Sequence, residues 1–230
     1  MTQPHGLHFA LWNRLRSNLR LKVVLLLSLP VVVTVAYLGI QREIIFPARR
    51  VPLTWLDGVI PFRPRWIWAY LSLYLLNPIG PLFTRSRQDL LRYSRGILFL
   101  FVSGIVCFVF FPVAGPRPLS ADSYWLYQGL TGIDRPYNSF PSLHAGCAVY
   151  AVLFAAYASL DTSHRTLRTC LMTVAWIWVA LILYSTIATR QHFFIDLPGG
   201  MFLGWLAYRL LVVKRTAVTE LSVATHGETA

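Results

Sequence analysis

Acidic residues, lysine and cysteine are all scarce in this sequence of 230 residues. Charged residues make up 13% of it and hydrophobic residues 56%, and the mean hydropathy is +0.53. So few charges cannot cover the surface of a soluble domain, and we therefore predict an integral membrane protein. The net charge of +12 comes from basic residues scattered between apolar runs. Because they form no continuous basic stripe, nucleic acid is not an expected partner.

The three cysteines, Cys107, Cys147 and Cys170, all lie in apolar runs. That setting excludes a disulfide framework and a zinc-binding spacing, so we predict that they are packing residues. The sequence also lacks an HExxH motif and has few spare carboxylates. A metal site of two histidines and a carboxylate is an alternative, but we expect neither a metal nor another cofactor.

Apolar runs long enough to cross a membrane recur along the chain. A hydrocarbon core needs about 20 residues, and about 17 are tolerated. We predict an all-α fold, a bundle of six transmembrane helices at residues 23–40, 66–83, 96–114, 144–160, 170–189 and 197–213. The expected organisation is a basic cytoplasmic segment (residues 1–22), one transmembrane domain (23–213) and a polar cytoplasmic tail (214–230).

Arginine and lysine set the expected orientation, because cytoplasmic loops carry an excess of both. Basic loops expected at residues 85–95 and 161–169, together with the basic amino-terminal segment, favour both termini inside. Residues 41–65 are too polar to span and are expected to lie along the membrane surface. Polar segments around Arg117, at 137–144 and at 185–196 then emerge together on the opposite side. We expect the membrane to be a bacterial inner membrane, with the predicted site at the periplasmic or exterior end of the bundle.

These polar segments carry a histidine pair with nearby basic side chains. His192 and Asp196 are four residues apart, so on a helix the carboxylate can reach the ring and fix one tautomer. The other ring nitrogen is then free to act as a nucleophile. His144 could donate a proton to a leaving group. Positive charge and neutral donors suited to a phosphate are expected from Arg117, Arg135, Arg190 and Ser142.

Each of these residues also has a plainer interpretation. An interfacial histidine is usually a hydrated polar residue, and a His-x-x-x-Asp pair occurs often by accident. Ser185 alone is most simply a hydroxyl bonded to a preceding helix carbonyl. Gly200 and Gly204 fit a close helix contact, and we interpret them as packing residues. The functional interpretation rests on several such groups falling on one side of the membrane.

The motifs resemble those of the type 2 phosphatidic acid phosphatase superfamily. Residues 141–144, Pro-Ser-Leu-His, are similar to its Pro-Ser-Gly-His signature. Ser185, His192 and Asp196 resemble its third motif, Ser-Arg-x5-His-x3-Asp, and Arg117 with the following proline resembles the end of Lys-x6-Arg-Pro. The resemblance covers roughly residues 66–213. It implies that His192 attacks phosphorus, Asp196 orients it, His144 protonates the leaving oxygen, and Ser185 belongs to the phosphate-binding set.

Two positions depart from the family pattern. Phe110 stands where the lysine of the first motif is expected, and Thr186 stands where the arginine of the third motif is expected. Arg190, two residues before His192, is the expected substitute. The wider sequence around both histidines is more similar to the branch that contains inositol phosphorylceramide synthases and sphingomyelin synthase-like enzymes. That branch transfers a phospho-headgroup to a lipid alcohol.

We therefore expect a membrane enzyme that cleaves a lipid phosphoester through a phosphohistidine on His192. The predicted partners are the membrane and a lipid phosphate or phospholipid substrate, and arginines take the role that magnesium plays in other phosphoryl transfer. Two alternatives stay open. One is a headgroup transferase, and the other is a transporter that uses His192 and Asp196 as a proton relay. The sequence does not determine the oligomeric state.

Overall fold

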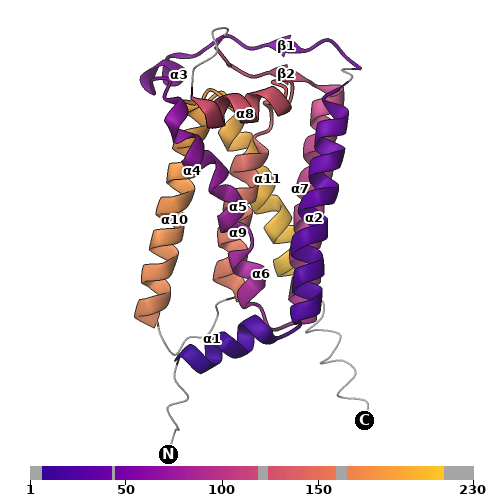
Figure 1. Cartoon of the computed structure of the whole chain (residues 1–230), viewed down its shortest axis with the longest axis vertical. Coiled ribbons are helices and arrows are strands. Elements are labelled where there is room, and N and C mark those ends of the chain that lie inside the picture. Colours follow the sequence, from indigo (N-terminus) through magenta and orange to yellow (C-terminus); the bar gives the residue numbers. More distant parts are fainter. Residues whose placement is uncertain (1–6, 43–44, 119–123, 159–164, 215–230) are drawn as a thin grey trace, which may run out of the picture.

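The computed structural model describes residues 7–42, 45–118, 124–158 and 165–214. The chain is mostly helical, with its long helices running side by side and a short parallel strand pair across one end (Figure 1). The long helices are α2 (Leu19–Ile40), α7 (Arg87–Phe110), α9 (Leu143–Ala158), α10 (Arg165–Ala188) and α11 (Asp196–Tyr208), the last continued by a π-helical turn, η3 (Arg209–Val213). The shorter elements are α1 (Leu7–Arg16), β1 (Arg49–Arg50), α3 (Trp55–Val59), the 3₁₀ turn η1 (Pro64–Trp66), α4 (Ile67–Leu71), α5 (Leu73–Leu76), α6 (Ile79–Phe83), β2 (Val113–Ala114) and α8 (Trp125–Ile133).

Within the described residues, three helices are long and apolar enough to cross a membrane: α2, α7 and α10. They correspond to the first, third and fifth predicted spans. The fourth predicted span is the shorter apolar helix α9, and the sixth is α11 with its π-helical turn. The predicted all-α class is confirmed, and the count of six spans stays a prediction.

The second predicted span, residues 66–83, is not one continuous helix. It is divided into η1, α4, α5 and α6, which follow one another along the bundle (Figure 1). Pro78 precedes α6 and Pro81 lies within it, and a proline supplies no backbone N–H to a helix. The Ser72 hydroxyl donates to the Ala69 carbonyl at the first break, which competes with regular helix bonding.

The predicted basic loop at residues 85–95 is wrong, because α7 begins at Arg87. Ser86 caps this helix by accepting hydrogen bonds from two backbone N–H groups of its first turn. Asp89 and Arg92 then form an ion pair of 2.7 Å one turn into the helix. Arg92 is almost fully buried, so its charge is part of the helix packing.

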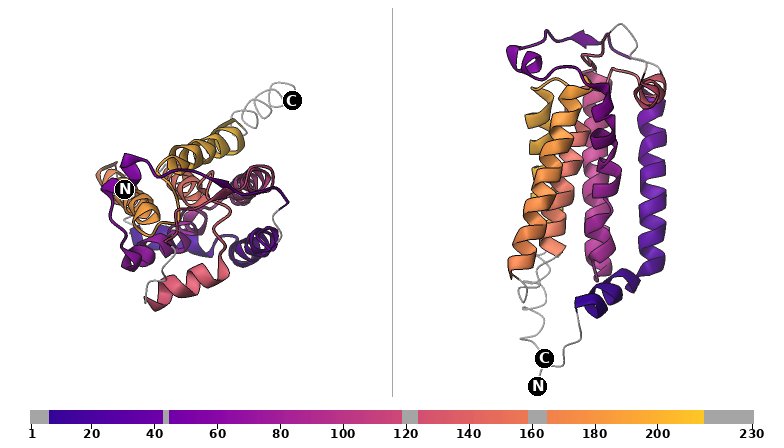
Figure 2. Two further views of the ribbon diagram at one scale, coloured as in Figure 1. Left: turned by 90° about the horizontal axis from the view of Figure 1, so that it is seen from above. Right: turned by 60° about the vertical axis from the view of Figure 1, so that its left-hand side comes forward.

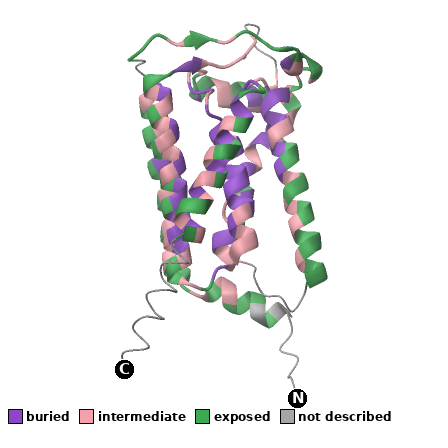
Figure 3. Ribbon diagram, turned by 180° about the vertical axis from the view of Figure 1, so that it is seen from behind, coloured by how far each residue is buried: buried purple, intermediate pink, exposed green. Residues whose placement is uncertain are grey.

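The outward faces of the long helices are apolar and exposed. On α2 the exposed positions recur on one face, at Val24, Leu27, Val31 and Val35, and the lower part of α10 is exposed in the same way (Figure 3). An apolar outer surface of this extent is compatible with a lipid environment and not with water. The long apolar helices and their exposed faces support an integral membrane protein.

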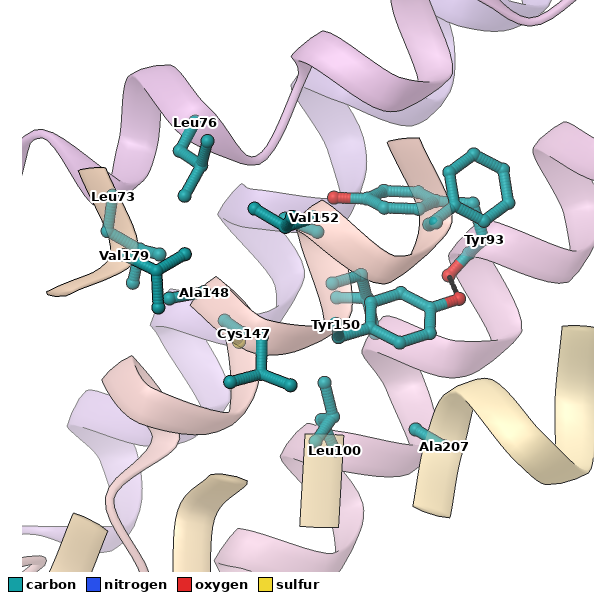
Figure 4. Close-up of a cluster of buried hydrophobic side chains, with 14 of the residues drawn as sticks. Leu73, Leu76, Tyr93, Leu100, Cys147, Ala148, Tyr150, Val152, Val179 and Ala207 are labelled. Carbon is teal, nitrogen blue, oxygen red and sulfur yellow. Dashed lines mark hydrogen bonds between the residues drawn. The ribbon is translucent and has the colours of Figure 1, made fainter. Parts of the chain in front are cut away.

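The core is built around α9, which is buried along most of its length (Figure 3). Tyr150 of α9 is fully buried, and its hydroxyl donates to the Tyr93 carbonyl of α7 at 3.1 Å (Figure 4). Cys147 lies in the same cluster and Cys107 is half-buried, as expected of packing residues. Cys170 is exposed on α10, so its predicted packing role is not met within this chain.

A cap of extended chain crosses the end of the bundle at which α9 and α11 begin (Figures 1 and 2). It is formed by residues 45–65 together with β2 and α8. Arg49 and Arg50 of β1 pair in parallel with Val113 and Ala114 of β2. Val113 also forms a bridge with Asn138, so the strand pair fixes the stretch that leads into α9. The predicted position of residues 41–65 along the membrane surface stays a prediction.

Candidate active site

The amino-terminal ends of α9 and α11 lie against each other. Ser142, fully buried, donates its backbone N–H to the Asp196 carbonyl at 3.2 Å, and its hydroxyl accepts from the Ala145 N–H at 3.3 Å in the first turn of α9. Gly200 of α11 approaches so closely that a Cβ there would lie 2.0 Å from the Ser142 carbonyl oxygen. This contact brings two motifs distant in sequence to one place. Gly204 makes a similar approach to Gly146, so the packing interpretation of both glycines in α11 is confirmed.

A backbone carbonyl sets the tautomer of His192. The His192 Nδ1 atom lies 2.9 Å from the Ser139 carbonyl oxygen, and a carbonyl can only accept. Nδ1 must therefore carry the proton, which leaves Nε2 of a neutral ring with a free lone pair. The Asp196 Oδ2 atom lies 3.6 Å from Nδ1, which is beyond a normal hydrogen bond, so the contact between the two side chains is electrostatic.

The Asp196 carboxylate is buried and held in place by its own donors. Its Oδ2 atom accepts from the Ser139 hydroxyl at 2.5 Å and from the Phe193 backbone N–H at 2.8 Å. Ser139 thus contacts both members of the pair, through its carbonyl and through its hydroxyl. These bonds fix the distance between the carboxylate and the His192 ring.

His144, in the first turn of α9, faces the same place. Its ring stacks on Tyr70 with centroids 3.8 Å apart, and its centroid lies 6.2 Å from that of His192. The His144 Nε2 atom is buried and has no hydrogen-bond partner among the described residues. A buried polar atom without a partner is costly unless something else satisfies it. The two histidines can therefore present nitrogens to a shared ligand.

Arg117 is connected to this centre through Gln191. Its guanidinium donates to the Gln191 Oε1 atom at 2.5 Å, to the Asp134 carboxylate at 2.6 Å and to the Asp134 carbonyl. Asp134 also accepts from Tyr37 and Gln41 at the end of α2. The Nε atom of Arg117 is buried without a hydrogen-bond partner in the described structure. Arg117 is thus fixed beside the histidine loop with a donor to spare.

Arg190 is turned onto the cap instead. Its φ of 54° is in the left-handed region, and its guanidinium donates to the carbonyls of Asp57 at 2.6 Å and Ile60 at 3.3 Å. The Asp57 carboxylate in turn accepts from the Phe194 N–H at 2.7 Å. The loop that carries His192 is therefore tied to α3 on both sides of the histidine.

The protonation of Asp57 follows from these contacts. Burial raises the pKa of this carboxyl, but donors from Thr54 and Phe194 and the charge of Arg190 outweigh burial and lower the pKa below its ordinary value. A depressed pKa in the folded state contributes stability that is complete above the ordinary value of about 3.9. That contribution is lost as the pH falls through the lowered pKa, so the tie is intact at neutral pH.

Two other predicted site residues make contacts elsewhere. The Arg135 guanidinium donates to the Arg42 carbonyl at 3.2 Å, and no described contact links it to either histidine. The Ser185 hydroxyl donates to the Ile182 carbonyl at 2.6 Å inside α10, which is the plain helix interpretation of a serine there. The structure thus gathers His144, His192 and Asp196, with Ser142 and Arg117 beside them.

Four residues that contact the site residues or the histidine loop were not predicted from the sequence: Ser139, Gln191, Tyr70 and Asp57. Ser139 and Gln191 lie within or beside the recognised motifs, so closeness to the histidines was a signal for them. Tyr70 lies inside the second predicted span and Asp57 inside the predicted surface segment 41–65, and neither is close in sequence to a recognised motif. No group of three or more histidine, cysteine, aspartate and glutamate side chains suited to a metal ion occurs in the part of the chain that the structure describes.

A family model described as the PAP2 superfamily matches residues 36–210, which is more than half of the chain. The chain belongs to the PAP2 superfamily. The matched region contains both histidines, the α9–α11 contact and the cap. PAP2 membership confirms the family resemblance and supports an enzyme that acts on lipid phosphoesters.

Two curated relatives are similar to part of the chain. The inositol phosphorylceramide synthase catalytic subunit of Saccharomyces cerevisiae is 26% identical over 87 residues, 38% of this chain and 20% of the yeast protein. The inositol phosphorylceramide synthase of Candida albicans is 28% identical over 96 residues, 42% of this chain and 18% of the Candida protein. The matches span about a fifth of the length of these two relatives. Both relatives are inositol phosphorylceramide synthases, the branch predicted from the sequence motifs. No solved structure matches the chain significantly.

Proposed function

We propose that this protein is an integral membrane phosphatase or phosphotransferase that cleaves a lipid phosphoester through a phosphohistidine on His192. The Nε2 atom of His192 attacks phosphorus, and the P–O bond to the leaving alcohol breaks. Protonated His144 gives its proton to the departing oxygen. In the second step neutral His144 takes a proton from water or an alcohol, whose oxygen attacks phosphorus while the P–N bond breaks and returns its electrons to His192.

The observation that carries this proposal is the arrangement of the histidine pair. The rings lie 6.2 Å apart between centroids, and an attacking atom in a near-attack geometry lies about 3–3.5 Å from its target. The two rings are therefore close enough for one phosphoryl group to contact both, with a nucleophile on one side and a proton donor on the other. The Ser139 carbonyl supports His192 as the nucleophile, because it keeps the proton on Nδ1.

The phosphate oxygens need donors that do not titrate at neutral pH. Arg117 supplies a guanidinium next to the histidine loop, with its Nε atom unpartnered in the described structure, and Ser142 supplies a neutral hydroxyl near the start of α9. Arg190, Arg135 and Ser185 stay candidates from the sequence, although each has another partner in this structure. Charge-assisted bonds of this kind stabilise the negative charge of phosphoryl transfer.

The molecule that accepts the phosphoryl group distinguishes the two enzyme functions. If water attacks the phosphohistidine the protein is a phosphatase, and if a lipid alcohol attacks it is a transferase. The matches to two inositol phosphorylceramide synthases favour keeping the transferase as the second candidate. For either function we propose one transmembrane domain of six spans over residues 23–213, with the site at the periplasmic or exterior end of a bacterial inner membrane.

Two parallel incubations separate the candidates. The purified protein in lipid nanodiscs is given phosphatidic acid, or a phospholipid with a labelled headgroup and a diacylglycerol or ceramide acceptor. Release of inorganic phosphate identifies a phosphatase, and transfer of the labelled headgroup identifies a transferase. Neither product, together with proton movement across vesicles that is lost in His192→Ala, would favour the proton-relay transporter instead.

A further inference from the structure

The structure contains an apolar cavity of about 300 Å³ between α2, the α4–α6 segment, α7 and α9. Most of its lining is aliphatic or aromatic, including Leu26, Leu29, Val33 and Ile97. Cavities that bind small molecules start at about this size. An empty apolar cavity forfeits dispersion contacts along its whole lining, so in a membrane hydrocarbon is expected to fill it.

One end of the cavity is the candidate active site. His144 lines it there together with Tyr70, on which the His144 ring stacks, and with Asp134, which Arg117 holds. A molecule in the cavity therefore continues directly to the proposed proton donor. A lipid phosphate bound at the histidines would therefore have its hydrocarbon at this cavity.

Lys22, which is fully buried, lines the other end of the cavity. Its ammonium donates to the Arg14 carbonyl of α1 at 2.5 Å and to the Leu82 carbonyl of α6 at 2.7 Å. The lining follows α2 from Lys22 to Leu38, a rise of about 24 Å at 1.5 Å per residue. One leaflet of a hydrocarbon core about 30 Å thick is only about 15 Å deep, so the cavity reaches past the midplane.

We propose that this cavity binds one extended acyl chain of the lipid substrate and selects for its length. The inference rests on the proposed function for the identity of the lipid. A chain entering from the bilayer exchanges hydrocarbon for protein, so the hydrophobic effect gives no net gain and selection depends on fit. Chains that reach the Lys22 end make the most contacts, and a bulky side chain in the path forces the tail out.

Two positions on α2 test the path at different depths, and a neighbour on the same helix is the control. Val33 is buried in the wall about one turn from Tyr37, and Leu26 lies about one turn from Lys22. Val32 is 59% exposed on the outer face. Val33→Trp blocks the cavity near the site, Leu26→Trp blocks it near the floor, and Val32→Trp adds the same indole outside.

The first measurement is phosphate release from dihexanoyl, dilauroyl and dioleoyl phosphatidic acids by the full chain. We expect Val33→Trp to lower kcat/KM about tenfold or more for the dilauroyl and dioleoyl lipids, since overpacking a filled site is strongly unfavourable. Leu26→Trp should lower it for dioleoyl only. Both losses should be smallest on dihexanoyl lipid, whose short tails need least of the cavity, and Val32→Trp should match the wild type on every lipid. Equal losses on all three lipids, or no loss on any, overturn the proposal.

The second measurement does not depend on turnover. Phosphatidic acid with a photoreactive diazirine at the end of its tail is cross-linked to the protein, and the labelled residues are identified by fragmentation in mass spectrometry. Labelling near Lys22, around Leu26 and Pro81, supports the cavity even if the lipid is never hydrolysed, in which case only the proposed function fails. Labelling confined to the outer face, around Leu27 and Val31, shows that the tail stays in the bilayer and overturns the inference.

Discussion

At the scale of single residues, Ser139 explains why His192 can act as a nucleophile. Its carbonyl accepts from Nδ1 and its hydroxyl donates to Asp196, so the carboxylate is left with an electrostatic role. In a triad whose aspartate also selects the tautomer, replacing that aspartate by asparagine costs about 10⁴-fold. Because Ser139 sets the tautomer here, we expect the same substitution at Asp196 to lower activity by less.

Asp196→Asn should lower kcat about 10²–10³-fold, the size expected when one electrostatic contact to the transition state is removed. The asparagine oxygen can still accept from Ser139 and Phe193, so the ring should stay in place and KM should change little. Phosphate release from a lipid phosphate measures both constants. A loss below tenfold would contradict a role for the carboxylate charge.

Arg117 and Arg190 are expected to act differently. Arg117→Ala should lower kcat/KM about 10²-fold because it removes a charge-assisted bond from the unpartnered Nε atom to phosphate. Arg117→Lys should restore little of it, because a single ammonium cannot hold Asp134, Gln191 and phosphate at once. Arg190→Ala should loosen the histidine loop from α3. Arg50→Ala, an exposed arginine on β1, serves as the control with unchanged activity.

A double-mutant cycle decides whether Arg190 positions the loop. Asp57→Ala removes the acceptor of the Phe194 N–H on the far side of His192. If both residues hold the same loop, the double variant should lose less activity than the two single losses combined predict. Fully additive losses would show that Arg190 acts separately, as a direct phosphate ligand does.

The sequence predicted His144, His192 and Asp196 correctly as neighbours, because motif spacing and the order of helices determine which ends meet. It did not predict Ser139, since that role depends on a backbone carbonyl 53 residues from His192. The contacts of Arg190 could not be predicted from the sequence either. A left-handed φ and contacts to carbonyls of a distant short helix leave no pattern in the residue types.

At the scale of elements, the close contact of α9 with α11 positions the site. Gly200→Ala should destabilise the protein by about 1–3 kcal/mol or more, because the new methyl group meets backbone and cannot be accommodated by a rotamer change. It should also lower activity, since Ser142 directly precedes α9. Gly129→Ala in α8, where nothing lies within 4 Å of the new Cβ, should be neutral or stabilising by up to about 1 kcal/mol. Equal thermal stability of both variants in detergent would count against this contact.

Element boundaries were predicted less well than element positions. The division of residues 66–83 follows from Pro78, Pro81 and a serine that bonds to its own helix, but hydropathy averages over such features. The early start of α7 follows from the Ser86 cap and the Asp89–Arg92 pair. The capping serine and the Asp89–Arg92 spacing are both present in the sequence. The loop was predicted instead because arginine is abundant in this stretch.

At the scale of the whole molecule, the two ends of the bundle differ. The cap and α8 lie at the end that carries the histidines, whereas α1 and the first turns of α7 and α10 lie at the other end (Figure 1). Lysine and arginine accumulate on the cytoplasmic side of membrane proteins. The end with Arg14, Arg87 and Arg165 is therefore expected to be cytoplasmic.

Thiol labelling tests this orientation in a variant whose three cysteines are replaced by alanine. Trp125→Cys, exposed on α8, should react with a membrane-impermeant maleimide in intact cells. Arg165→Cys at the opposite end should react only after the membrane is permeabilised. The reverse pattern would place the histidines on the cytoplasmic side.

The most direct test of the account as a whole is the detection of the phosphohistidine itself. The wild-type protein, quenched shortly after mixing with a phosphorus-labelled lipid phosphate, should carry label that is stable to base and labile to acid. His192→Ala should carry none, and His144→Ala should still be labelled by a substrate whose leaving group departs unprotonated. Label that persists in His192→Ala, or the absence of label in a wild-type protein that turns over the substrate and accumulates product in a burst, would contradict the covalent mechanism.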